Sequence, residues 1–323
     1  MATEGQLDAT VAELAAQIAK IEANVTSVVE GKQNVVRLAL IALLAEGHLL
    51  LEDVPGVGKT LLAKAIGRSI DCTVRRVQFT PDLLPSDITG VTVYNQERGT
   101  FEFKPGAVFA NIVLGDEINR AGPKTQSALL EAMEERTVSL DGVTHELDVP
   151  FMVIATQNPI ELEGTYPLPE AQRDRFLMRL SIGYPSAEAE LEVLDVHGRG
   201  DRLADLRPVA HASDVAQMIA TVKEVHAADP LKRYVVDFVR ATREHPALEL
   251  GASPRAALAL LRAARAQAAS NGRDYVIPDD VKALVQPVLA HRLIVTPEAQ
   301  MSGTTAADVL AELLETVPVP TGG

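Results

Sequence analysis

The sequence predicts an α/β fold in which helices cover both faces of a parallel sheet, followed by a smaller all-helical domain. Between residues 48 and 182, short apolar runs alternate with helical segments, which is the pattern of buried parallel strands. Two pairs of alternating strands interrupt this pattern, so two β-hairpins are expected as insertions. After residue 184, only helical periodicity remains. We therefore expect a core domain over residues 1–185 and a helical domain over residues 186–323.

Two helices are predicted before the sheet. Apolar residues recur at spacings of three and four from Leu7 to Val28, which predicts an amphipathic helix packed on its own domain, with a coiled-coil arm as the alternative. The segment 33–45 is apolar on most sides and predicts a buried second helix. The core is then expected to contain strands at residues 48–52, 73–79, 111–114, 151–155 and 176–182, and helices at residues 59–69 and 125–136.

The two inserted hairpins have different turns. The first pairs residues 91–94 with residues 100–103 around a polar tip. The second pairs residues 137–140 with residues 143–147 around the dipeptide Asp141-Gly142. An Asp-Gly pair between strands is a strong hairpin signal, because both residues tolerate positive φ.

The helical domain is expected to begin after Pro185. Ser186, Ser213 and Ser253 precede helical segments and are candidate N-caps. The predicted helices span residues 186–197, 213–228, 231–244, 254–270, 278–290 and 305–315.

Composition and charge narrow the classes of function. The chain of 323 residues carries 30 Lys and Arg against 44 Asp and Glu, a formal charge of −14, which disfavours non-specific binding to nucleic acid or anionic lipid. The single cysteine, Cys72, excludes an internal disulfide, and no Cys/His cluster has zinc-ligand spacing. The N-terminus lacks the layout of a signal peptide, and no apolar stretch approaches the roughly 20 residues that span a bilayer. We therefore expect a cytoplasmic protein.

A strand, a glycine-containing loop and a helix follow one another in the segment LLLEDVPGVGKTLLAKAI. The backbone N–H groups of such a loop, with the helix N-terminus, surround the phosphates of a nucleotide. Lys59 is expected to meet the β- and γ-phosphates, and the Thr60 hydroxyl to ligate Mg²⁺. Asp53 stands where the pattern G-x-x-x-x-G-K-[ST] expects its first glycine. The predicted phosphate-binding residues are Pro55, Gly56, Val57, Gly58, Lys59, Thr60 and Leu61.

Two carboxylates follow the apolar run at residues 112–114. Asp116 and Glu117 are expected at the carboxyl end of a buried strand, which is the edge at which parallel sheets bind ligands. Asp116 would hold Mg²⁺ through water, and Glu117 would orient and polarise the attacking water. Together with the phosphate loop, they predict phosphoryl transfer from a nucleoside triphosphate to water.

Three further residues are candidates for the same chemistry. Asn158 ends the next buried strand, where its amide could bond both the γ-phosphate and the attacking water. Arg175 precedes the last core strand and is a candidate arginine finger for the next subunit's nucleotide, the alternative being a solvated basic cluster with Arg173 and Arg179. Arg255 falls in the first turn of a helix and could reach a γ-phosphate, although a solvated arginine is the simpler interpretation.

Together, these motifs resemble the AAA+ ATPases, and the segments DVPGVGKT, DEINRA and GTYPLPEAQRDRF resemble the MoxR family in particular. The resemblance covers roughly residues 7–317. It implies a P-loop AAA+ core with ATP and Mg²⁺ as ligands, a helical lid domain, and hairpins matching the helix-2 insert and the pre-sensor hairpin. It also implies that Asn158 and Arg255 are the two sensors, that Arg175 is the finger, and that copies form a ring, commonly a hexamer.

The resemblance further implies a chaperone-like machine that remodels or matures protein complexes, including metal-cofactor insertion, with a separate partner that carries a von Willebrand A domain. Three alternatives stay open: a nucleotide-gated scaffold without an enzymatic role, the motor subunit of a metal chelatase, and a nucleic-acid translocase. The hairpin tips disfavour the translocase, because hairpins that grip DNA need Lys or Arg, whereas one tip carries Asp141-Gly142 and the other carries Glu97 beside Arg98. The sequence leaves the adenine contacts open, with residues 28–31 as candidates. It also leaves open whether Arg255 acts on the nucleotide of its own subunit or on that of a neighbour.

Overall fold

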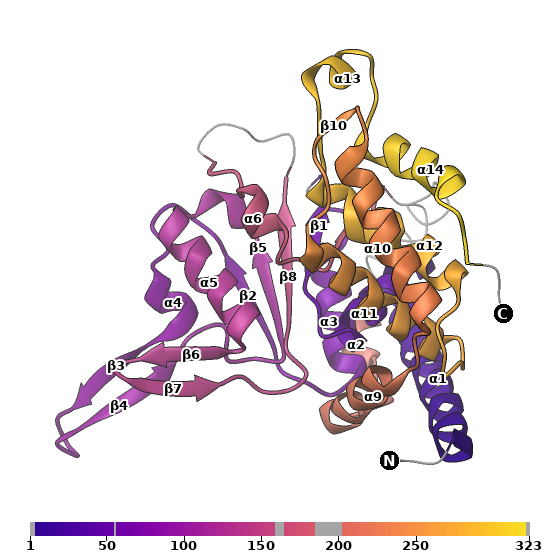
Figure 1. The fold of residues 1–323 in the computed structure, drawn as a ribbon. Coiled ribbons are helices and arrows are strands. Elements are labelled where there is room, and N and C mark those ends of the chain that lie inside the picture. The colour runs from indigo at the N-terminus through magenta and orange to yellow at the C-terminus, as the bar shows by residue number, and fades with distance from the viewer. Residues whose placement is uncertain (1–3, 55, 159–164, 185–201, 321–323) are drawn as a thin grey trace.

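The computed structural model describes residues 4–54, 56–158, 165–184 and 202–320, and it confirms the parallel sheet. Five strands lie in the order β2-β5-β8-β1-β9, and every neighbouring pair is parallel (Figure 1). Because the strands run the same way, their carboxyl ends share one edge of the sheet. The strands are β1 (Leu49–Glu52), β2 (Val74–Gln78), β5 (Ile112–Asp116), β8 (Met152–Gln157) and β9 (Met178–Leu180).

Helices cover both faces of the sheet, and the alternation of side chains along each strand explains why. Leu49 and Leu51 belong to one buried cluster, whereas Leu50 belongs to a second cluster on the opposite face. The first cluster packs under α1, α2 and α3, and the second packs under α5. These helices are α1 (Glu4–Thr26), α2 (Gln33–Leu44), α3 (Lys59–Ser69) and α5 (Pro123–Glu135).

Both predicted hairpins are present, and they lie side by side (Figure 1). In the second hairpin, Asp141 and Gly142 have φ of 51° and 80°, as the Asp-Gly turn requires. The rings of Phe103 and His145 stack with centroids 4.0 Å apart and join the two hairpins. Helix α4 (Pro85–Thr89), which precedes the first hairpin, was not predicted. The hairpin strands are β3 (Gly90–Asn95), β4 (Thr100–Pro105), β6 (Thr137–Leu140) and β7 (Val143–Glu146).

The C-terminal part is mainly helical, and it contains short elements that were not predicted, among them helices at residues 202–205 and 297–301. Strands β10 and β11 form a small antiparallel ribbon. Ser253 is confirmed as an N-cap, since its hydroxyl accepts a hydrogen bond from the N–H of Ala256. The cap predicted at Ser213 is wrong, because the helix begins earlier and is capped by His211. Ser186 and the helix predicted at residues 186–197 lie outside the described residues.

The remaining elements are short or belong to the C-terminal part. They are η1 (Ile118–Arg120), α6 (Glu170–Arg173), α8 (Arg202–Asp205), α9 (Ala212–Glu224), α10 (Asp229–Glu244), β10 (Leu248–Leu250), α11 (Pro254–Ser270), α12 (Pro278–Leu289), η2 (Ala290–Arg292), β11 (Ile294–Val295), α13 (Pro297–Met301) and α14 (Ala306–Thr316). Among the described residues, no helix combines the length and apolar character needed to cross a membrane.

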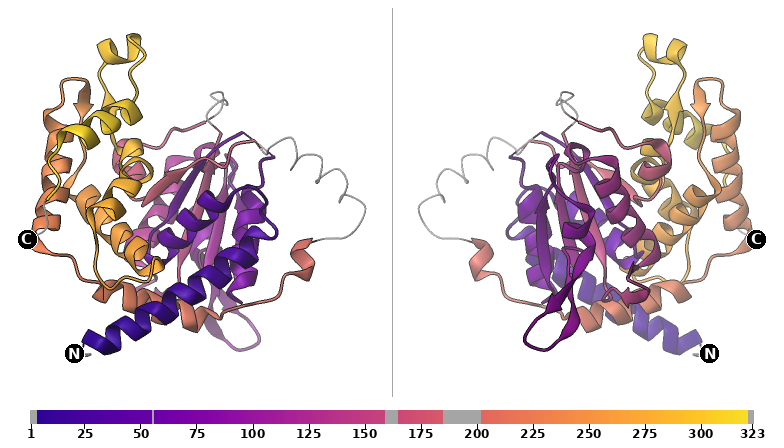
Figure 2. Two further views of the ribbon diagram at one scale, coloured as in Figure 1. Left: turned by 90° about the vertical axis from the view of Figure 1, so that its right-hand side faces the viewer. Right: turned by 90° about the vertical axis from the view of Figure 1, so that its left-hand side faces the viewer.

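Helix α1 packs inside its own chain rather than projecting as an arm. Its stripe from Val11 to Val25 is buried, while Val28 lies beyond the end of the helix. The helix contacts α2 and α3 of the core and also α9 and α11 of the C-terminal part (Figure 2). One apolar cluster therefore continues across the boundary predicted at residues 185 and 186, and that boundary stays a prediction.

Candidate active site

The loop between β1 and α3 has the backbone of a phosphate cradle. Gly56 and Gly58 have φ of 86° and 94°, in the region that favours glycine, and no atom lies within 4 Å of the position of an added Cβ. Gly58 also caps α3, so no side chain covers the first-turn N–H groups of that helix. A helix N-terminus open in this way attracts anions. Pro55 lies outside the described residues.

Lys59 and Thr60 open helix α3, as the sequence predicts. The Lys59 ammonium donates a hydrogen bond to the backbone oxygen of Asp53 at 2.8 Å. Partial burial lowers the pKa of Lys59, while the charges of Asp53, Asp116 and Glu117 act in the opposite direction. The lysine is thus close to both carboxylates predicted for the site. The side chains of Val57 and Leu61 pack against the core. These two residues can therefore bind a phosphate only through their backbone N–H groups.

Asp116 is buried at the end of β5, beside the phosphate loop. Its Oδ2 atom pairs with Nε of Arg76 on the adjacent strand at 2.6 Å, and its Oδ1 atom accepts a hydrogen bond from the Thr156 hydroxyl at 3.3 Å. The carboxylate is therefore held in one orientation. The oxygens of Thr60 and Asp116 suit Mg²⁺, which prefers oxygen ligands and keeps several waters.

Glu117 follows directly and has a left-handed backbone, with φ of 57°. Its N–H donates to the Thr156 hydroxyl at 2.9 Å. Its Oε2 atom accepts a hydrogen bond from Nε2 of Gln78 at 2.9 Å and pairs with Nε of Arg120 at 2.8 Å. Two side chains thus hold the carboxylate that the sequence assigned to water activation.

Sequence reasoning missed Arg76, Gln78 and Arg120. Gln78 stands opposite Asp116 in the parallel register of β2 and β5. A signal was available for Gln78: it is a polar residue next to the end of the strand predicted at residues 73–79, which precedes the acidic one. Asn158 is buried directly after β8, at the same edge of the sheet as Glu117.

Asp53 explains the departure from the phosphate-loop pattern. Its buried carboxylate accepts hydrogen bonds from the Ser181 hydroxyl at 3.2 Å and from the N–H groups of Ile182 and Gly183. Asp53 is not among the residues with positive φ, so the backbone does not require a glycine here. The carboxylate instead joins the start of the phosphate loop to the chain that leaves β9.

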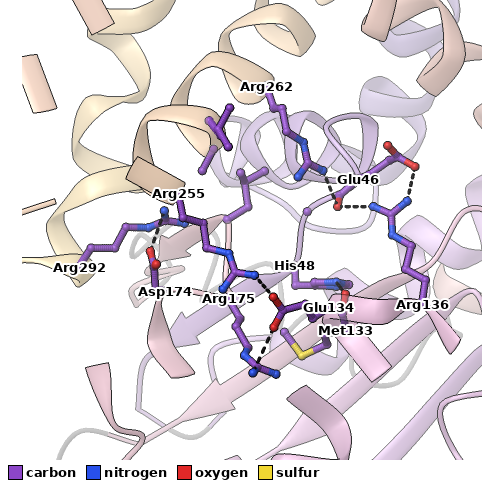
Figure 3. A pocket seen from close by; sticks show the side chains of 14 residues that line it. Glu46, His48, Met133, Glu134, Arg136, Asp174, Arg175, Arg255, Arg262 and Arg292 are labelled. Atoms are coloured by element: carbon purple, nitrogen blue, oxygen red, sulfur yellow. Dashed lines mark hydrogen bonds and ion pairs between the residues drawn. The ribbon is translucent and has the colours of Figure 1, made fainter. Parts of the chain in front are cut away.

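The two predicted arginines lie together, but at the other edge of the sheet. Arg175 and Arg255 line a cavity of about 280 Å³ whose wall includes Gly47 and His48, which precede β1 (Figure 3). The phosphate loop follows the opposite end of β1. Since a strand rises about 3.3 Å per residue, the four residues of β1 separate the two edges by roughly 13 Å.

The residues around this cavity are tied together by ion pairs. Both oxygens of Glu134 are paired, one with Arg175 at 3.1 Å and the other with Arg255. Arg292 is nearly fully buried and lies 3.0 Å from Asp174, an ion pair without hydrogen-bond geometry. Burial lowers the pKa of Arg292 to about 10, although the charge of Asp174 opposes this.

Hydrogen bonds attach the C-terminal part to the core at this cavity. The Ser253 hydroxyl donates to Asp174 Oδ2 at 3.0 Å, and Arg292 donates to the backbone oxygen of Phe176 at 2.7 Å. Arg262 of α11 donates to the backbone oxygens of Ala45 and Glu46. The first turn of α11, which carries Arg255, is therefore fixed against the segment that carries Arg175.

Comparisons with known proteins agree with this geometry. Residues 48–178 match the model of the ATPase family associated with various cellular activities (AAA), and residues 240–313 match the AAA lid domain. The chain is 50% identical to the uncharacterized protein YeaC of Bacillus subtilis over 94% of this chain and 95% of that protein. It is 44% identical to chaperone MoxR1 of Mycobacterium tuberculosis over 95% and 84%.

A solved structure supports the same assignment. The crystal structure of a protein from Cytophaga hutchinsonii matches with a TM-score of 0.90 and 39% identity, over 96% of this chain and 97% of that one. The fold is thus shared with that structure along nearly the whole length of the chain. The chain belongs to the MoxR family of AAA+ ATPases.

Proposed function

We propose that the protein hydrolyses ATP at sites shared between neighbouring copies of the chain in a ring, and that it uses this cycle to remodel protein clients. One observation carries the proposal. The phosphate loop, Asp116, Glu117 and Asn158 gather at one edge of the sheet, whereas Arg175 and Arg255 gather at the other. Arginines at that distance do not serve their own subunit's nucleotide, but a second copy can bring them to it.

The residues at the carboxyl edge have separate tasks. The loop N–H groups and Lys59 hold the phosphates, for which Lys59 leaves the oxygen of Asp53. Glu117 orients the attacking water, and the Asn158 amide holds that water against the γ-phosphate. Bound Mg²⁺, held by Thr60 and by Asp116 through water, supplies charge neutralisation at the phosphates. Arg175 of the neighbour then stabilises the charge of the transition state.

The hairpins support a protein client over nucleic acid. Phe101 is 73% exposed and Tyr94 is 51% exposed, and their rings contact each other on the first hairpin. Arg98 at its tip pairs with Glu102 at 3.0 Å, so its charge is balanced within the hairpin. Exposed aromatic residues, beside a tip arginine whose charge is balanced, suit an apolar polypeptide better than a phosphate backbone.

The family resemblance extends the proposal to partners. The relative named chaperone MoxR1 supports a protein client for this chain. We extend this to a ring of six copies, to a separate partner with a von Willebrand A domain, and to maturation of complexes that contain metal cofactors. The client itself is to be found by capture on the ATP-bound ring.

Mixing two inactive variants tests the shared site. Lys59→Ala removes a contact to the subunit's own nucleotide, and Arg175→Ala removes the contact to the neighbour's. Each variant alone is expected to lack ATPase activity. In a mixture, an interface that joins the intact loop of one variant to the intact arginine of the other is complete, so activity returns.

The mixture is decisive in both directions. ATPase activity that appears on mixing, with a specific activity that rises with total protein concentration, supports hydrolysis at interfaces. A silent mixture of well-folded variants would contradict it. A wild-type specific activity that does not depend on protein concentration would favour a nucleotide-gated scaffold instead. Partner affinity that follows the bound nucleotide, and that is unchanged in Glu117→Gln, would favour the scaffold as well.

A further inference from the structure

Glu134 holds the two arginines of the proposed shared site as a pair. It lies in the last turn of α5, and one of its carboxylate oxygens pairs with Arg175 while the other pairs with Arg255 (Figure 3). Arg175 also donates to the backbone oxygen of Leu130 at 2.7 Å, which fixes its guanidinium over the same helix. One anion therefore links an arginine before β9 to an arginine of α11.

These two arginines differ from Arg136 and Arg292, which also line the cavity. Arg292 is 3% exposed and has Asp174 as its own partner, and Arg136 pairs with Glu46. The side chains of Arg175 and Arg255 are 30% and 46% exposed, and they share one carboxylate. Two cations with one anion leave a positive charge, and their exposure allows both to reach an anion outside the subunit.

We propose that Glu134 is a positioning residue that keeps Arg175 and Arg255 side by side. It releases both arginines to the terminal phosphate of a nucleotide that is bound to a second copy of this chain. This inference rests on the proposed function of the preceding subsection. A carboxylate and a terminal phosphate both accept paired hydrogen bonds from guanidinium groups, but the phosphate offers more charge and a third oxygen. The phosphate therefore displaces Glu134 when the neighbour carries ATP, and the arginines stay with Glu134 when it carries ADP.

The exchange has a measurable cost, because the Glu134 pairs must break before the interface forms. Glu134→Gln removes the competing charge and keeps the shape of the side chain. Association of copies in ATP should then occur at about three- to fivefold lower protein concentration, the effect of one partly exposed ion pair. In ADP the midpoint of association should not change. Turnover at saturating protein should fall, because the arginines are no longer held as a pair.

Sedimentation in ATP and Mg²⁺ measures the midpoint, with Glu117→Gln as the background so that ATP persists. Glu135→Gln is the matched control: it removes the same charge one residue away on α5, from an exposed side chain for which the described part of the structure shows no ion pair. Glu134→Asp keeps the charge on a shorter side chain that does not span both arginines, and it should fall between wild type and Glu134→Gln.

A midpoint for Glu134→Gln that equals that of Glu135→Gln, or that lies above the wild-type value, would overturn the role of Glu134. The proposed function fails separately, through a silent mixture of Lys59→Ala and Arg175→Ala. If the mixture is active and the midpoint is unchanged, only the inference about Glu134 is lost.

Discussion

The carboxylate of Asp53 accepts hydrogen bonds from the N–H of Gly183 at 3.3 and 3.2 Å, through its two oxygens. Asp53 begins the phosphate loop, and Gly183 follows β9, the last strand of the sheet. The contact therefore fastens the nucleotide-binding loop to the edge strand from which the chain continues toward the lid. It also explains why a loop with an aspartate in the first glycine position is well formed.

Replacing Asp53 should weaken nucleotide binding although the residue is not expected to touch the nucleotide. Asp53→Gly restores the glycine of the sequence pattern but leaves the N–H groups of Ile182 and Gly183 without their acceptor, and the buried N–H of Ile182 alone costs about 1–3 kcal/mol. We expect at least a tenfold loss of affinity for a fluorescent ATP analogue and a lower melting temperature. Asp53→Asn, which keeps one acceptor oxygen, should lie in between. Wild-type affinity in Asp53→Gly would contradict this account.

Lys59 and Glu117 should separate binding from hydrolysis. Lys59→Ala removes the ammonium near the phosphates and should abolish measurable ATP binding. Glu117→Gln keeps the side chain's size and its contact with Gln78 but removes the charge that polarises water, so ATP should bind normally and turnover should fall about 100-fold or more. Equilibrium binding and phosphate release, measured on the same preparations, distinguish the two steps. Normal turnover in Glu117→Gln would remove Glu117 from its assigned role.

Local signals explain what the sequence predicted well. The Asp141-Gly142 turn, the Ser253 cap and the helix that begins at Lys59 each depend on neighbours within a few residues. The strands of the sheet were found because their apolar runs are bounded by turns. Asp116, Glu117 and Asn158 could be placed at one edge because parallel strands end together.

Contacts between distant segments account for what the sequence missed. Nothing local indicates that Arg255 meets Glu134, which lies 121 residues earlier. The same holds for Gln78 and Glu117, and for the pair formed by Arg76 and Asp116. The β10–β11 ribbon has strands of only three and two residues, too short for a period of two to show. Ser213 failed as a cap because the helix begins after His211, two residues earlier, where the Asp214 carboxylate accepts a hydrogen bond from the N–H of His211.

Asp174 should be the anchor between the lid and the core. Asp174→Ala leaves the buried guanidinium of Arg292 without its counterion and removes the acceptor of Ser253. Loss of one partner of a buried pair costs about 3–5 kcal/mol, so a large drop in the free energy of unfolding by urea is expected. Asp174→Ala combined with Arg292→Met should recover most of the loss, since no buried charge then remains. A double variant as unstable as Asp174→Ala would show that the charge of Arg292 is not the cause.

Acid should destabilise the fold through His48. The ring is buried between the sheet and α5, where Nε2 donates to the backbone oxygen of Met133 at 3.0 Å and Nδ1 accepts from the N–H of Val153 at 2.9 Å. Burial lowers the pKa of His48 to about 4, against an ordinary value of 6.5, and the charges of Arg136 and Arg262 act in the same direction. A proton on Nδ1 would also break the bond from Val153.

The sign of the effect follows from proton binding. Between pH 6.5 and pH 4 the unfolded chain binds a proton that the folded chain refuses, so this contribution is complete above pH 6.5 and is lost as the pH falls toward 4. The shift corresponds to roughly 3 kcal/mol of unfolding free energy. Urea unfolding at pH 7, 5.5 and 4 should show this loss in the wild type and a flatter profile in His48→Gln. His211→Gln, a change at an exposed histidine, serves as the control. If His48→Gln kept the full wild-type slope, the acid sensitivity would have to reside in other groups, such as buried His291, whose pKa is also lowered by burial.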